Sequence, residues 1–285
     1  MKLLRVGTAG AERPALIDAD GNLRDLSGVV PDIDGALLAD DAAMARVRAA
    51  AEAGELPVLD AAGVRTGAPL GRIGKVVCIG LNYHDHARET GARPPAEPVV
   101  FLKAADTVVG PNDTVLVPRG SVKTDWEVEL AVVIGRTARY LDSAEDALAH
   151  VAGYTVAHDV SEREYQMDRG GTWDKGKNCE TFNPLGPWLV TADEVPDPQK
   201  LGLKLWVNGE LKQDGSTAEQ IFPVGEVVRY LSHFMTLYPG DVINTGTPAG
   251  VAFGQPEPKP YLRPGDVVEL EIDGLGRQRQ ELKGA

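Results

Sequence analysis

Cysteines, clusters of basic residues and long apolar runs are all scarce in this sequence. Cys78 and Cys179 are its only cysteines, in no spacing typical of a disulfide framework or a thiolate zinc site. The net charge is -13 without any block of consecutive Lys or Arg, so the basic surface of a nucleic-acid or anionic-membrane binder is missing. No apolar run approaches the length of a bilayer span, and residues 1–7 lack the apolar segment of a secretion signal. We therefore expect a cytoplasmic protein without nucleic-acid or membrane partners.

The chain is long enough for a main domain of about 200 residues with a smaller companion. Residues 1–70 predict a small α/β domain, because residues 3–6 and 15–17 are typical of short strands and residues 41–53 of an Ala-rich helix. Glycine and proline then recur in a stretch with little periodicity, which indicates a linker or an extended crossing. We expect residues 71–285 to form the larger, main domain.

Short apolar runs separated by Gly, Pro, Asn and Asp dominate the second domain, so we expect an α+β protein that is mostly β. The expected strands are residues 76–79, 128–134, 153–157, 203–207, 241–244 and 267–272. The expected helices are residues 83–89, 143–149, 161–168 and 224–235. Helices should therefore be accessories to the sheets.

Two carboxylates share one face of the strand expected at residues 128–134. Glu127 and Glu129 alternate with the apolar positions that begin at Val128, so both point to the same side of a period-2 strand. Such a pair is either solvated on an open face or held by a cation. Asp159 follows residues 153–157 and is either a turn residue or a third carboxylate for Mg²⁺, Mn²⁺ or Ca²⁺.

A short helix at residues 83–89 places His86 and Glu89 on one face, with Asn82 as N-cap and Gly91 as terminator. Glu89 could orient His86 as a general base that activates water, or the two could form an ordinary surface pair. His84 lies on a different part of the helix surface from His86, which disfavours a histidine zinc site.

Two loops contain polar groups that suit an anionic ligand. Lys177 lies in a Gly-rich stretch and could supply a cation to a carboxylate or oxyanion, or the stretch could be a solvated loop. Thr247 lies in a turn after residues 241–244, and its hydroxyl could contact a ligand. The stretch with Lys177 lacks the pattern of a nucleotide-binding P-loop, and the segment with Thr247 could equally be a turn without a ligand.

The order of these signals between about residues 75 and 270 resembles the fumarylacetoacetate hydrolase family. The matching pieces are Ile79-Gly80-Leu81-Asn82-Tyr83 with His86 and Glu89, Phe101-Leu102-Lys103, Trp126-Glu127-Val128-Glu129, His158-Asp159 with Arg163 and Gln166, Lys175-Gly176-Lys177, Val207-Asn208-Gly209-Glu210, and Thr245-Gly246-Thr247-Pro248. The resemblance implies a mixed β-sheet roll and a homodimer.

The resemblance also assigns roles to individual residues. It implies that Glu127, Glu129 and Asp159 bind a divalent metal, Mg²⁺ or Mn²⁺ with Ca²⁺ as an alternative. It implies that His86 and Glu89 activate water on a mobile lid helix and that Lys177 acts beside the metal. It further implies that Lys103, Arg163, Gln166 and Thr247 bind the substrate.

The resemblance implies a metal-dependent hydrolase that cleaves the C3–C4 bond of a small anionic 2,4-dioxo acid. An acylpyruvate or a 2,4-diketo-3-deoxy sugar acid would yield a pyruvate-type product and a second acid. Bacterial hydrolases of 2,4-diketo-3-deoxy-L-rhamnonate are similar in the N-terminal unit and in residues 153–189. Oxaloacetate decarboxylation and isomerisation of a 2-hydroxy-diene-dioate are alternatives within the family, and a non-catalytic metal-stabilised binding module is an alternative outside it.

Overall fold

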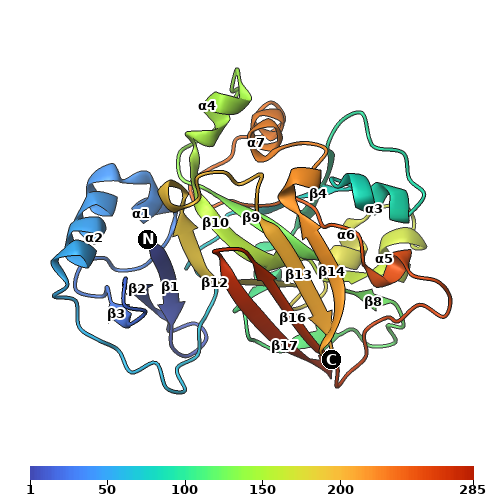
Figure 1. Cartoon of the computed structure of the whole chain (residues 1–285), viewed down its shortest axis with the longest axis horizontal. Coiled ribbons are helices and arrows are strands. Elements are labelled where there is room, and N and C mark those ends of the chain that lie inside the picture. Colours follow the sequence, from blue (N-terminus) through green and yellow to red (C-terminus); the bar gives the residue numbers. More distant parts are fainter.

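Two β-sheets stacked face to face form the centre of the molecule (Figure 1). The structure is a computed structural model that describes residues 1–285. The larger, ten-stranded sheet has the order β3 (Leu23–Asp25), β2 (Arg13–Ile17), β1 (Lys2–Val6), β12 (Asn183–Thr191), β10 (Val151–His158), β9 (Val128–Ile134), β15 (Val242–Asn244), β4 (Val76–Gly80) and β5 (Val99–Lys103), with β6 (Val108–Val109) paired to β12.

The smaller, five-stranded sheet has the order β14 (Glu210–Ser216), β13 (Gly202–Val207), β16 (Val267–Ile272), β17 (Gly276–Gly284) and β7 (Val115–Val117). A separate two-stranded ribbon pairs β8 (Thr124–Asp125) with β11 (Ser161–Glu162). Most pairs are antiparallel, but β4–β15, β6–β12 and β7–β17 are parallel. The expected α+β, mostly β class with mixed sheets is therefore confirmed.

The helices surround the sheets and are short. They are α1 (Gly35–Ala39), α2 (Asp41–Ala53), α3 (His84–Glu89), α4 (Ala144–Leu148), α5 (Arg163–Met167), α6 (Asp174–Lys177) and α7 (Val224–Ser232), with 3₁₀ turns at Ala105–Thr107, Ala192–Glu194, Thr217–Glu219 and Ala252–Gly254. In Figure 1, α1 and α2 lie at one end of the long axis, and α3, α5 and α6 gather at the other. No helix combines the length and apolar character required to cross a bilayer.

Strand β9 lies at the centre of the core because both of its faces are buried. Leu130 and Val132 pack into the cluster between the two sheets, where they meet side chains such as Leu205 of β13. Ala131 and Val133 point the other way and join a cluster that reaches Val47 of α2. The alternation therefore assigns Glu129 to the second face, away from the five-stranded sheet.

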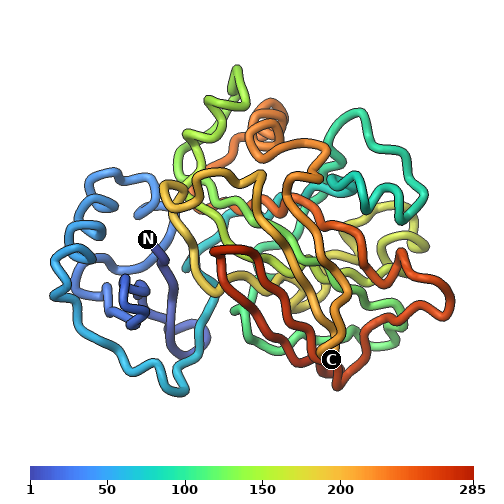
Figure 2. Tube along the Cα trace, viewed as in Figure 1, coloured from blue at the N-terminus to red at the C-terminus, as the bar shows by residue number.

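The N-terminal strands continue the larger sheet, because β1 pairs with β12 through Lys2↔Val190 and Leu3↔Leu189. The chain then crosses from α2 to β4 without a helix or strand of its own, as the tube in Figure 2 shows. This agrees with the expected extended crossing. The division of the chain at residues 70 and 71 stays a prediction.

Two local predictions need correction. The helix expected at residues 161–168 begins at Arg163, because Ser161 and Glu162 pair with β8 as strand β11. Asn82 does not cap α3, which has Tyr83 as its N-cap without a side-chain bond. The Asn82 amide instead donates to the carbonyls of Phe222 and Thr245, so tertiary contacts compete with the capping role.

Candidate active site

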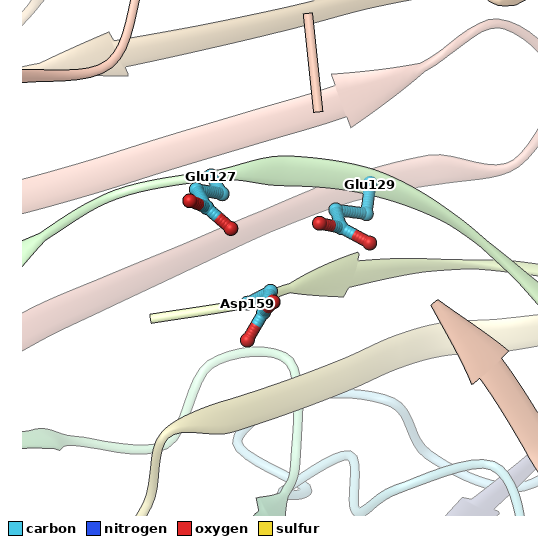
Figure 3. Close-up of side chains that lie close together, drawn as sticks. All are labelled: Glu127, Glu129 and Asp159. Carbon is cyan, nitrogen blue, oxygen red and sulfur yellow. The ribbon is translucent and has the colours of Figure 1, made fainter. Parts of the chain in front are cut away.

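Two carboxylates from one strand meet a third, distant in sequence, beside the neighbouring strand (Figure 3). Glu127 and Glu129 lie at the start of β9, and Asp159 follows the end of β10. The antiparallel register pairs Ala157 with Glu129, and the Asp159 amide donates to the Glu127 carbonyl at 3.0 Å. One oxygen from each of the three carboxylates lies within 4.8 Å of the others, and all three residues are buried. We call Glu127, Glu129 and Asp159 the acidic trio.

Three buried cations surround the acidic trio. Lys177 Nζ lies 2.6 Å from Glu127 Oε2 and 2.7 Å from Asp159 Oδ2, so it bridges two carboxylates. Arg163 Nη2 lies 2.7 Å from the second Glu127 oxygen. Lys103 Nζ lies 2.5 Å from Asp159 Oδ1. These ion pairs lower the cost of burying the charges of Glu127 and Asp159.

Glu129 differs from the other two carboxylates because it forms no ion pair. Its Oε2 accepts only the Gly246 amide, at 2.8 Å. Burial, with the charges of Asp159 and Glu127, raises the pKa of Glu129 well above its ordinary value. Burial also acts to raise the pKa of Glu127, but the charges of Lys177 and Arg163 outweigh it and hold that pKa at about 2. A divalent cation would compensate the Glu129 charge, and the all-oxygen donor set fits Mg²⁺ or Mn²⁺.

His86 and Glu89 form a hydrogen-bonded pair on α3, with His86 Nδ1 3.1 Å from Glu89 Oε2. The other Glu89 oxygen accepts the Gly250 amide at 2.9 Å, which ties the helix to the loop after β15. The side chain of His86 lines the same cavity as Glu127 and Glu129. Because Nδ1 contacts Glu89, Nε2 is the nitrogen left to accept a proton in the cavity.

The residues expected to bind substrate occupy different depths. Arg163, Gln166 and Thr247 line the cavity. Arg163 also donates to Asp125 at 2.8 Å and to Gln166 at 2.9 Å, so it orients its neighbours as well. Lys103 does not line the cavity, because its Nζ lies behind Asp159 and also donates to the Val160 carbonyl at 3.1 Å.

The location of Lys103 predicts that it supports Asp159 and does not contact the substrate. Lys103→Met removes one of two buried cations paired with Asp159, so we expect the free energy of unfolding in urea to fall by about 3–5 kcal/mol. The KM of the remaining folded enzyme should change little. Unchanged stability together with a large rise in KM would instead indicate direct substrate contact.

The cavity has a volume of about 270 Å³ and an uneven lining. Charged and polar groups meet at the acidic trio, whereas much of the remaining wall is apolar. The apolar residues include Leu81, Ala92, Phe101, Met167, Trp173 and Phe253. Trp173 packs over Gly80, where a Cβ atom would lie 2.2 Å from the indole ring, so only glycine allows this contact.

Sequence reasoning missed three residues that hold the site together. Asp125 is fully buried and accepts from Arg163 and from the amides of Ala252 and Phe253, at 2.8 to 2.9 Å. Asp125 lies two residues before Glu127, so it continues the period-2 pattern of Glu127 and Glu129, and this was a usable signal for it. The others are Asp174 and Asn178.

Asp174 and Asn178 fix the short helix α6 to the edge strand β5. Asp174 accepts the Leu102 amide at 3.2 Å. The Asn178 amide group donates to the Leu102 carbonyl at 3.0 Å and accepts from the Ala104 amide at 2.5 Å. These contacts hold Lys177 over the acidic trio, and no local sequence signal indicates them because β5 is remote in the chain.

Comparisons with known proteins agree with this fold and site. The family model described as fumarylacetoacetate (FAA) hydrolase C-terminal matches residues 75–283. A Burkholderia ambifaria protein, named provisionally as a hydrolase, is 55% identical over 285 residues, which is 100% of both chains. A 2-hydroxyhepta-2,4-diene-1,7-dioate isomerase from Mycobacterium marinum has 33% identity and a TM-score of 0.77, with 100% of this chain and 98% of that chain covered.

A maleylpyruvate hydrolase from Sphingobium sp. SYK-6, solved with manganese (II) ion and pyruvate, has 29% identity and a TM-score of 0.81, with 100% of both chains covered. The family match extends over most of the residues that form the two sheets, and the acidic trio lies inside it. The chain therefore belongs to the fumarylacetoacetate hydrolase family and is an enzyme of its hydrolase and isomerase group.

Proposed function

We propose that this enzyme is a divalent-metal-dependent hydrolase that cleaves the C3–C4 bond of a 2,4-dioxo acid. The observation that carries the proposal is that Glu127 and Glu129 of the acidic trio line the same cavity as His86, which Glu89 holds by a hydrogen bond. A cation site alone would serve several reactions on 2-oxo acids. A histidine held by a carboxylate adds a means of activating water, which favours hydrolysis.

Glu127, Glu129 and Asp159 would hold the metal, Mg²⁺ or Mn²⁺. When bound there, it would supply a Lewis acid for the carboxylate and C2 carbonyl of a 2-oxo acid and would stabilise negative charge on that end. Thr247 and Lys177 line the same end of the cavity and would orient the substrate. The Thr247 hydroxyl donates to the Val128 carbonyl and accepts from Gln213, both at 2.8 Å, which fixes its position.

His86 would act as the general base. Glu89 holds Nδ1, so Nε2 would take a proton from a water molecule that attacks the C4 carbonyl. Lys177 would stabilise the oxyanion at C4, since it is buried and positively charged. Collapse of that intermediate breaks the C3–C4 bond, leaves the second acid and releases the enolate of a pyruvate-type product, which then takes up a proton.

A substrate panel with and without metal tests this proposal. Acylpyruvates, a 2,4-diketo-3-deoxy sugar acid, oxaloacetate and a 2-hydroxy-diene-dioate should be assayed with Mg²⁺, with Mn²⁺ and with a chelator. We expect pyruvate release from at least one 2,4-dioxo acid that depends on metal and stops on chelation. Turnover of oxaloacetate or of the diene-dioate alone would replace hydrolysis with decarboxylation or isomerisation.

The non-catalytic alternative has its own outcome in the same panel. A metal-stabilised binding module would bind a 2-oxo acid, which calorimetry detects, but would turn over no member of the panel. The position of His86 in the cavity lining argues against it, because a binding module needs no oriented base.

A further inference from the structure

The cavity has a buried floor and a partly exposed mouth, and the two ends differ in chemistry. Glu129 and Lys177 at the floor are each 2% exposed. Met167 is 47% exposed, and Leu81, Ala92 and Trp173 are partly exposed. A substrate whose 2-oxo acid end lies at the floor therefore directs its far end toward these four apolar side chains.

Both permanent cations of the cavity lining lie at the floor. Lys177 and Arg163 contact the same Glu127 carboxylate, at 2.6 and 2.7 Å. Any anionic group that they recognise must therefore lie next to Glu127. His86, the remaining basic side chain of the lining, is engaged with Glu89. The mouth has no cation in its wall.

The cations near the mouth that do not line the cavity either bind other groups of the protein or are exposed. Arg169 pairs with Glu164 at 2.5 Å, and Lys175 donates to the Arg169 carbonyl at 2.7 Å. Lys259 lies on the ring of Phe253 and donates to the carbonyl of that residue. Arg93 follows Ala92, is exposed and, unlike these three cations, has neither an ion pair nor a side-chain hydrogen bond.

We propose that the group on C4 of the substrate is uncharged and mainly apolar, and that this enzyme discriminates against 2,4-dioxo acids with a second carboxylate. This inference rests on the proposed function. A distal carboxylate would lose its hydration against a wall formed by Leu81, Ala92, Met167 and Trp173, and no cation in that wall would compensate its charge. An alkyl or aryl group would gain by burying apolar surface against the same side chains.

An isosteric pair of substrates tests the inference. The two 2,4-dioxo acids carry on C4 either a 3-methylbutyl group or a 2-carboxyethyl group, which match in shape and differ in charge. We expect kcat/KM for pyruvate release to be at least tenfold higher for the 3-methylbutyl compound. An equal or higher kcat/KM for the 2-carboxyethyl compound would overturn the inference. Failure of both compounds and of the wider panel would instead refute the proposed hydrolase itself.

Three variants identify the part of the cavity wall that discriminates between the two compounds. Met167→Arg places a cation at the mouth and should raise the relative kcat/KM for the 2-carboxyethyl compound several-fold, whereas Met167→Gln, of similar length but neutral, should not. Arg93→Ala should leave the preference for the 3-methylbutyl compound unchanged. A fall in turnover of the 2-carboxyethyl compound confined to Arg93→Ala would show that Arg93 recognises a distal carboxylate, contrary to the inference.

Discussion

Replacing Glu129 with glutamine is expected to abolish metal-dependent turnover while keeping the free energy of unfolding in urea within about 1 kcal/mol of the wild type. Glu129 is a member of the acidic trio, so its loss removes one of three metal ligands. It forms no ion pair, and its one accepted hydrogen bond, from Gly246, can be kept by the glutamine carbonyl. The variant should therefore fold and fail to bind metal.

Thermal unfolding gives a readout that does not depend on activity. A metal that binds only the folded protein stabilises it by RT ln(1 + [L]/Kd), about 2.7 kcal/mol at 100 Kd. Mg²⁺ or Mn²⁺ should raise the Tm of the wild type and leave Glu129→Gln unchanged. Glu281→Gln is a matched control, because that glutamate is exposed on β17. Equal metal stabilisation of wild type and Glu129→Gln would argue against the acidic trio as the metal site.

Glu127 is a poorer choice for this experiment, although it belongs to the same trio. Its carboxylate pairs with both Lys177 and Arg163, so glutamine at this position removes one of the two carboxylate partners of each buried cation. Breaking a buried ion pair in this way costs about 3–5 kcal/mol, which would confuse lost metal binding with lost stability. The distinction between the two glutamates comes from the tertiary structure alone.

The second large effect is expected for His86→Ala, which should retain metal binding and lower kcat for hydrolysis by about 10²- to 10⁴-fold. His86 contacts none of the acidic trio by hydrogen bond or ion pair, so its removal leaves the metal ligands in place. His84→Ala is the matched control, because His84 is exposed on the same helix. Its kcat should equal that of the wild type.

The reaction catalysed by the His86 variant separates water activation from other roles. Decarboxylation of oxaloacetate needs no attacking water, so any such activity of the wild type should survive in His86→Ala. Glu89→Gln should retain part of the hydrolytic rate, since the amide can still position the imidazole without stabilising its protonated form. Undiminished hydrolysis by His86→Ala would remove the His86–Glu89 pair from the mechanism.

Much of the site follows from local patterns in the sequence. The alternation of Glu127 and Glu129 with apolar residues was enough to place two carboxylates on one face of a strand, because side-chain direction in a strand has a period of two. The three-residue spacing of His86 and Glu89 similarly predicted their contact, because both residues lie within α3, which is helical from His84 to Glu89.

The sequence by itself therefore determined which chemical groups are available: two carboxylates on one face of a strand and a histidine with its own carboxylate. It contains no cluster of cysteines or of basic residues that would indicate a thiolate metal site or a nucleic-acid binder. Tertiary structure decided which of these groups contact one another and which of them line the cavity. Strand pairing brought Asp159 to Glu127, the docking of α6 on β5 placed Lys177 between them, and Lys103 came to lie behind Asp159 instead of in the cavity. The physical reason is range: side-chain direction depends on a few neighbouring residues, whereas charge pairing and burial depend on contacts between segments far apart in the chain.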